Sequence, residues 1–177
     1  MPDRDVKTIR DLIFFQYAKI IGKRAFGPGA KKEAYGFIKQ TYRQLVADKK
    51  KWSDILRNDK RLFDEPEACA YCGATSDLQW EHIVPRSLRI NERCATCDRI
   101  QSIHNMVRAC KHCNTAKGDK GLYHFIRDSH PEAKKFSDLV PVLVEEKYLK
   151  TIYCCHQCKG TLDTAIDGIT VLDLDLS

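Results

Sequence analysis

The chain has 177 residues, of which 43% are hydrophobic and 31% charged, and its formal net charge is +6. This length suits one domain of ordinary size, or a small core with appended segments. No apolar run is long enough to span a membrane, and the first residues lack the apolar stretch of a signal peptide. We therefore expect a cytoplasmic protein without membrane segments.

The positive charge is concentrated in the first third of the chain. Residues 1–61 carry a net charge of +9, residues 62–159 carry +1 and residues 160–177 carry −4. A cationic surplus of this kind is typical of a surface that meets phosphates. A solvated helical face would explain the surplus equally well at this point.

Two helices are predicted in this basic region. Apolar residues recur at helical spacing over residues 6–22, and Gly22 is suited to cap that helix. Gly27-Pro28-Gly29 then breaks the chain. A second helix is expected over residues 31–49, and a short one over residues 52–56 with Ser53 as its cap. The second helix has an apolar stripe formed by Tyr35, Ile38, Tyr42, Leu45 and Val46.

The chain contains nine cysteines, and eight of them form four Cys-x-x-Cys pairs. The pairs are Cys69/Cys72, Cys94/Cys97, Cys110/Cys113 and Cys155/Cys158. In a chain without a secretion signal this pattern favours thiolate metal ligands over disulfides. Four thiolates suffice for one tetrahedral zinc, so the count predicts two structural zinc ions, with Cys154 left over.

The sequence alone leaves open alternatives to this assignment of the cysteines. A thiol-disulfide motif would need a thioredoxin-like βαβ context, which the pattern does not offer. Cys94/Cys97 could share a metal with either of the knuckles at Cys69/Cys72 and Cys110/Cys113, and Cys154 could replace Cys155 as a ligand.

Two strands are predicted between the knuckles at Cys69/Cys72 and Cys110/Cys113. Residues 78–84 read as a strand ended by Pro85, and residues 105–109 as its partner. The intervening stretch is long for a hairpin loop, which suggests that it has its own order.

The C-terminal third is expected to be helical and then to end in a hairpin. Helices are predicted over residues 114–117, 122–127 and 136–153. An Asp-Gly turn at residues 167–168 would join strands at residues 161–166 and 169–174. The knuckle at Cys155/Cys158 followed by this hairpin looks like half of a zinc ribbon.

Residue types that phosphodiester hydrolysis would require occur between the knuckles at Cys69/Cys72 and Cys110/Cys113 and directly after the second one. This reaction needs a base to deprotonate water and a divalent cation to absorb the charge that develops on the phosphoryl oxygens. Glu81 and the amide oxygen of Asn114 are oxygen ligands of the kind that suit Mg²⁺ or Mn²⁺. A zinc held by four thiolates is coordinatively closed, and therefore structural.

The order Cys-x-x-Cys, Glu-His-Ile-Val-Pro, Asn, Cys-x-x-Cys-Asn-x-x-Lys over about residues 69–128 resembles the HNH (His-Asn-His) endonucleases. The resemblance implies a ββα-metal core with His82 as general base. It implies that Glu81 and Asn114 bind the catalytic metal and that Asn105 orients the base. It also assigns the first zinc to the knuckles at Cys69/Cys72 and Cys110/Cys113, which leaves Cys94/Cys97 with Cys155/Cys158.

This sequence departs from the common family pattern at two positions. The acidic residue is Glu81 where Asp is common, and the third position is Asn114 where many members have His. Both substitutions occur within the family, so they bear on metal preference more than on activity.

The sequence thus predicts an α+β fold with three regions. These are basic N-terminal helices (residues 1–66), an HNH module (residues 67–130), and a helix, zinc knuckle and hairpin (residues 131–177). The expected activity is metal-dependent cleavage of DNA, most simply duplex. The alternatives are a non-catalytic zinc module that binds nucleic acid or protein, and an RNA-directed nuclease. The residues expected to contact nucleic acid are Arg86, Lys117, Lys32, Lys39, Arg43, Lys49, Lys50 and Lys51.

Overall fold

The computed structural model describes residues 4–27, 32–51, 67–88, 98–133 and 139–174. The fold is α+β, with helices and one antiparallel sheet of two strands. The described elements are α1 (Ile9–Phe26), α2 (Lys32–Val46), β1 (Leu78–His82), η1 (Arg86–Leu88), α4 (Asp98–Gln101), η2 (Ile103–Asn105), β2 (Met106–Cys110), α5 (Lys111–Lys117), α6 (Leu122–Ser129), α7 (Val142–Lys159) and η4 (Val171–Leu174). Among the described residues, no helix combines the length and the apolar character that a membrane span requires.

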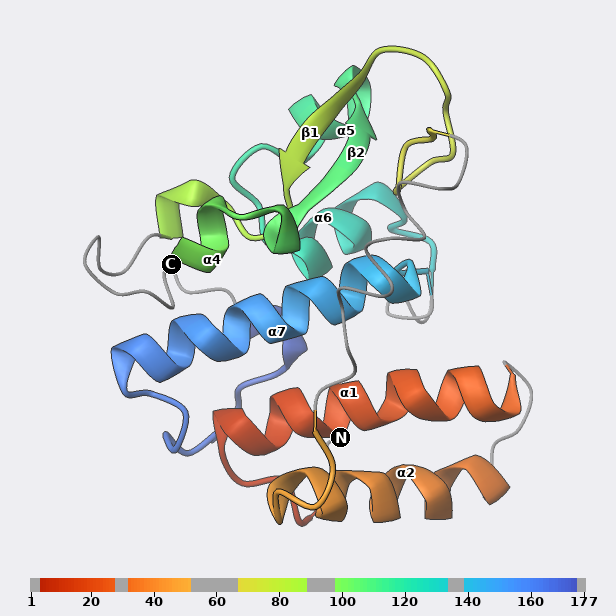
Figure 1. Ribbon diagram of the computed structural model, residues 1–177. Coiled ribbons are helices and arrows are strands. Elements are labelled where there is room, and N and C mark those ends of the chain that lie inside the picture. The colour runs from red at the N-terminus through yellow and green to blue at the C-terminus, as the bar shows by residue number, and fades with distance from the viewer. Residues whose placement is uncertain (1–3, 28–31, 52–66, 89–97, 134–138, 175–177) are drawn as a thin grey trace.

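The elements are stacked, with α1 and α2 at one end, α7 in the middle and the β1–β2 hairpin with α5 at the other end (Figure 1). A single hydrophobic cluster joins these levels and includes Ile13 of α1, Leu149 of α7 and Val107 of β2. Helix α7 therefore lies between α1 and the β1–β2 hairpin and contacts η2 and α4.

Helix α1 begins at Ile9, three residues later than predicted, and also ends later. Thr8 caps it in a reciprocal capping box with Asp11. The predicted end at Gly22 is wrong, because the helix continues to Phe26 and Gly27 at φ +74° ends it. Gly22 serves close packing instead, since a Cβ there would lie 2.7 Å from Cγ1 of Ile38 on α2.

The apolar stripe predicted on α2 is only partly buried. Tyr42 and Leu45 are buried, and the Tyr42 ring packs edge-on against Phe15 of α1. Tyr35 and Val46, in contrast, are 50% and 46% exposed. The short helix predicted at residues 52–56 lies outside the described residues.

The C-terminal region corrects the zinc-ribbon prediction. Helix α7 runs to Lys159, so Cys155 and Cys158 lie on a helix rather than in a knuckle. Within the described residues the predicted hairpin does not form, and Val171–Leu174 is a 3₁₀ helix. A turn does occur at Asp167 and Gly168.

The backbone of this C-terminal segment finds its partners on the N-terminus. The amide of Ile9 donates to the carbonyl of Thr164 (3.1 Å), the amide of Arg10 to that of Leu162 (2.8 Å), and the amide of Ile166 to that of Lys7 (3.1 Å). These bonds satisfy groups that a second strand would otherwise have taken, which explains why the hairpin is absent.

Candidate metal centre and nuclease site

Four cysteine side chains meet where the β1–β2 hairpin joins α5. Their Sγ atoms all lie within 4.8 Å of one another, and those of Cys72 and Cys110 are 3.7 Å apart. A tetrahedral zinc with Zn–S bonds of about 2.3 Å requires sulfur separations of about 3.8 Å. The four residues Cys69, Cys72, Cys110 and Cys113, which were predicted to share one zinc, therefore form a group that could hold such an ion.

Local backbone geometry produces this cluster. The amide of Cys69 donates to Ala74, and the amide of Gly73, at φ +77°, donates back to Cys69. The amide of Ala70 bonds to Arg108 of β2, which fixes the first knuckle against the sheet. Cys110 ends β2 and is also the N-cap of α5, so that helix carries Cys113 directly to the same point.

The thiol of Cys69 is suited to metal ligation. Burial raises its pKa, but backbone hydrogen bonds from Cys110, Cys72 and Tyr71 outweigh burial and lower the pKa to about 7. Because the thiolate is the form that binds metal, this environment favours ligation near neutral pH.

The register of the hairpin sends Glu81 toward α5. Strands β1 and β2 are antiparallel, with Glu81 opposite Val107. Side chains alternate along a strand, so Gln79 and Glu81 share the face that α5 covers, whereas Trp80 and His82 share the other. Asn114 of α5 donates through Nδ2 to Oε1 of Gln79 at 3.1 Å.

Glu81 is 4% exposed, and both of its carboxylate oxygens are bonded. The Lys117 ammonium lies 2.7 Å from Oε1, and the Tyr71 hydroxyl donates to Oε2 at 2.7 Å. Burial raises the pKa of Glu81, an effect that Lys117 and Tyr71 oppose. A buried carboxylate held by a cation and a hydroxyl is a place where a positive charge is stabilised.

The position of Lys117 differs from the prediction that it contacts a phosphate. It is 1% exposed, and its Nζ also donates to the backbone carbonyl of His82 at 2.9 Å. Lys117 thus ties α5 to the end of β1. The spacing Asn-x-x-Lys was visible in the sequence, but a charge on a short helix is normally solvated, so nothing indicated burial.

His82 is the last residue of β1 and is half-buried. Burial lowers the pKa of its imidazole, and the charges of Arg86 and Lys117 lower it further. A lowered pKa favours the neutral imidazole, which is the form that a general base requires. Its Nε2 is shielded from solvent and has no hydrogen-bond partner among the residues that the structure describes. Arg86, which begins η1 and is exposed, is one source of positive charge near this ring.

Asn105 holds the loop that follows His82 and does not bond to the imidazole. Its side chain is fully buried, accepts from the amide of Val84 (2.9 Å), and donates to the carbonyls of Val84 (2.8 Å) and Ile100 (2.9 Å). The carbonyl of Asn105 accepts from the amide of Ile83. Asn105 thus fixes the backbone on the C-terminal side of His82.

Lys147, which no sequence motif singled out, supports this arrangement. Lys147 of α7 is 1% exposed, and its Nζ donates to the carbonyls of Ile103 (3.2 Å) and Met106 (3.0 Å), on either side of Asn105. Tyr71, the other unpredicted contributor, lies inside the first knuckle. Neither residue belongs to a recognisable pattern, and the contacts of Lys147 join segments that are distant in the chain.

The second predicted zinc site falls partly outside the described residues, since Cys94 and Cys97 are not among them. Cys155 is buried, whereas Cys154 and Cys158 are half-buried. Within the described part of the chain, the only group of metal-binding side chains is the one around Cys110. A second zinc therefore remains a prediction.

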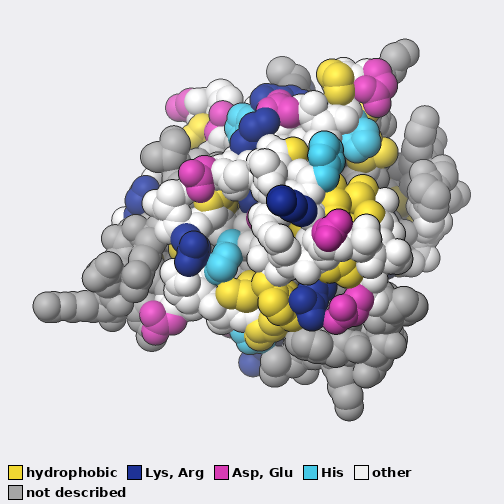
Figure 2. Space-filling model, turned by 90° about the horizontal axis from the view of Figure 1, so that it is seen from above, with side chains coloured by type: hydrophobic (Ala, Val, Ile, Leu, Met, Phe, Trp, Pro, Cys, Tyr) yellow, Lys and Arg dark blue, Asp and Glu magenta, His cyan; other side chains and the backbone are white. Residues whose placement is uncertain are grey.

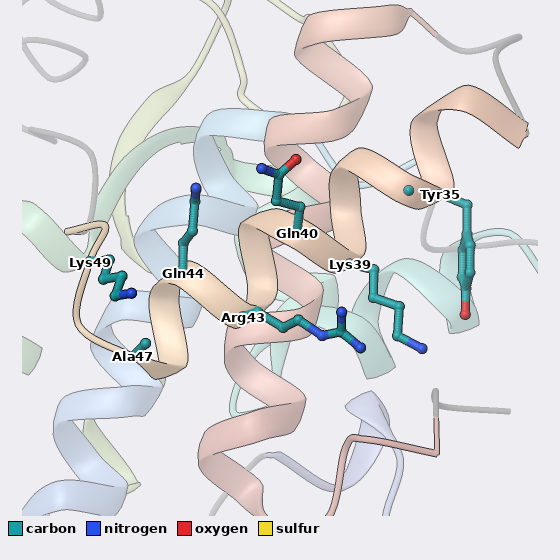
Figure 3. A pocket seen from close by; sticks show the side chains of 8 residues that line it. Tyr35, Lys39, Gln40, Arg43, Gln44, Ala47 and Lys49 are labelled. Atoms are coloured by element: carbon teal, nitrogen blue, oxygen red, sulfur yellow. The ribbon is translucent and has the colours of Figure 1, made fainter.

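The basic residues predicted to lie beside the nuclease module are remote from it. Lys39, Arg43 and Lys49 line a hollow of about 650 Å³ on α2, together with Tyr35 and Gln40 (Figure 3). Helix α2 is separated from the hairpin by α1 and α7 (Figure 1). Asp5 pairs with Lys39 (3.4 Å) and Arg43 (3.2 Å) and reduces the local charge. The side chain of Lys32 lies outside the described part, and Lys50 and Lys51 line a different hollow.

Taken together, these features describe a hairpin and helix built on a candidate zinc centre, with a histidine and a carboxylate at the end of the first strand. Residues 69–120 match the family model described as HNH endonuclease. No curated protein and no solved structure matches the chain. A nuclease-type domain is thereby indicated for this segment.

Proposed function

We propose that this protein is a metal-dependent HNH endonuclease that hydrolyses phosphodiester bonds in DNA. The single observation that carries the proposal is the state of His82. Burial and the charges of Arg86 and Lys117 lower the pKa of its imidazole. Among the described residues its buried Nε2 has no hydrogen-bond partner, and it lies at the end of a strand whose following loop Asn105 fixes. A buried nitrogen without a partner is costly, unless a group that enters with the substrate supplies one.

In the proposed mechanism, Nε2 of His82 accepts the proton of the attacking water. Asn105 positions the base through the backbone, and Lys147 holds the segment that carries Asn105. Arg86 is exposed beside His82 and would bind a phosphate oxygen of the substrate.

A catalytic cation would be held by Glu81 and Asn114, whose oxygens are ligands of the kind that Mg²⁺ and Mn²⁺ prefer. Both Glu81 oxygens are bonded in the structure, so the cation would take the place of the Lys117 ammonium. When bound, it would stabilise charge on the phosphoryl and leaving oxygens. The zinc at Cys110 would be structural.

One observation favours a second candidate, a non-catalytic zinc module. A carboxylate that is fully engaged by Lys117 and Tyr71 serves to hold α5 on the sheet, and this role needs no catalytic cation. Such a module would bind nucleic acid without cleaving it.

Incubation with supercoiled plasmid, linear duplex, single-stranded DNA and RNA, with Mg²⁺, Mn²⁺ or EDTA, separates the two functions. We expect cleavage of DNA that requires the cation and is lost in His82→Ala at unchanged zinc content. His112→Ala is the matched control, because His112 is an exposed histidine of the same module without an assigned role. Cleavage by His82→Ala at the wild-type rate contradicts the mechanism, and binding without cleavage supports the second candidate.

A further inference from the structure

The face of the hairpin that carries His82 also carries an exposed aromatic side chain. Trp80 lies two residues before His82 on β1, so the two side chains point to the same side of the sheet. Across the strands, Trp80 is paired with Arg108 and His82 with Met106. Seen from above, this end of the molecule shows hydrophobic, histidine, Lys or Arg, and Asp or Glu side chains interspersed on one face (Figure 2).

Trp80 and Arg108 form a defined unit. Cζ of Arg108 lies 4.2 Å from the centroid of the Trp80 ring, which is within the range of a cation–π contact. Nη2 of Arg108 also bonds to Oε1 of Glu67 at 2.9 Å, which holds the guanidinium over the indole. The two contacts together favour this orientation of the guanidinium over the ring.

This unit remains in contact with solvent. Trp80 is 41% exposed, and the Arg108 side chain is 33% exposed. A pair whose only role was to stabilise the sheet would gain more from burial, since a tryptophan contributes most of its energy by removing its surface from water. An exposed indole with an arginine guanidinium over its ring is instead a combination that binds bases of single-stranded nucleic acid by stacking and cation–π contact.

We propose that Trp80 and Arg108 form a platform on which an unpaired nucleobase of the substrate strand stacks, next to the phosphate that faces His82. The inference deepens the proposed nuclease function by naming the substrate class. It is a DNA strand with at least one unpaired base beside the scissile bond, as in single strands, flaps or bulges. Two residues along a strand are about 6.6 Å apart, so the platform lies beside the imidazole of His82 and does not cover it.

Intrinsic fluorescence tests the stacking directly. The chain has two tryptophans, so Trp52→Phe leaves Trp80 as the only one. In zinc-loaded protein that also carries His82→Ala, which prevents cleavage, we expect saturable quenching of Trp80 by a short single-stranded oligodeoxythymidylate. Binding of the same oligonucleotide, followed by anisotropy, without any change in Trp80 fluorescence overturns the proposal.

Affinity measurements give the second test. Removing the aromatic side chain of one base–aromatic stack raises the dissociation constant roughly 5- to 150-fold. We expect a loss in this range for Trp80→Leu with the single strand, a much smaller loss for Trp80→Phe, and little effect of Trp80→Leu on fully paired duplex. Phe26→Leu is the matched control, because Phe26 is 42% exposed and lies at the far end of α1.

The remaining outcomes are also decisive. Equal losses on single strand and duplex point to a groove contact and overturn the unpaired-base proposal, as does unchanged affinity with both. If Trp80→Leu does not fold, Trp80→Phe and the quenching experiment still decide. Quenching of Trp80 without Mg²⁺-dependent cleavage by the wild type supports the stacking platform and rejects the nuclease function. Cleavage by the wild type without quenching of Trp80 supports the nuclease function and rejects the stacking platform.

Discussion

The buried contact between Lys117 and Glu81 offers the sharpest test of the site geometry. The two side chains are 0% and 4% exposed, and Nζ lies 2.7 Å from Oε1. Lys117→Met keeps a side chain of similar length, but it leaves Glu81 with only the Tyr71 hydroxyl and leaves the carbonyl of His82 without the ammonium.

The expected cost follows from the burial of both partners. Removing one member of a buried ion pair typically destabilises a protein by about 3–5 kcal/mol, because the other charge stays buried and uncompensated. Glu81→Gln should cost a similar amount, since it leaves the Lys117 ammonium facing a neutral amide. The double variant removes both charges, so it should be less destabilised than the sum of the single variants by about 3 kcal/mol.

Urea unfolding of the wild type, both single variants and the double variant measures this coupling free energy. Zinc content must be equal in all four proteins, so that metal loss is not counted as loss of the pair. A coupling below about 0.5 kcal/mol, the size typical of exposed pairs, would refute the reasoning that the pair is buried and holds α5 against β1.

Four further predictions concern other parts of the molecule. Cys110→Ser should lose zinc and unfold the hairpin and α5 together, because metal-binding free energy at such a site is folding free energy; elemental analysis and circular dichroism measure this. Asn105→Ala should lower activity and destabilise the protein by about 2–4 kcal/mol, because it leaves three buried backbone partners unsatisfied; calorimetry and plasmid cleavage check it. His156 is buried, and burial is the main cause that lowers the pKa of its imidazole. As the pH falls below about 6.5, the unfolded chain therefore takes up the proton before the folded protein does, and the folded protein loses stability. His156→Gln should show a smaller loss of unfolding free energy than the wild type between about pH 6.5 and 5. Neutralising Lys49, Lys50 and Lys51 together should reduce the slope of log affinity against log salt by about two to three units if they contact duplex phosphates, and an unchanged slope would assign these lysines to solvated surface.

The cysteine cluster and the approximate position of β1 were predicted from the sequence alone. These predictions rested on the types and spacing of residues within short segments. Paired knuckles bring Cys69 and Cys110 together, whatever surrounds them, because the ligands of one metal must converge. Pro85 and the alternation of strand residues fixed the end of β1 close to its predicted position. The family match at residues 69–120 agrees with the resemblance read from those motifs.

Only the tertiary structure decided which charges are buried and which segments pair. Lys117 and Lys147 look like solvated residues in the sequence, yet each ammonium is buried against carbonyl or carboxylate oxygens that distant segments supply. The C-terminal segment had the turn of a hairpin but bonded to the start of α1, because the strength of strand pairing depends on which backbone groups lie within reach. Burial and partner choice are properties of the whole packed chain, and a local pattern does not contain them.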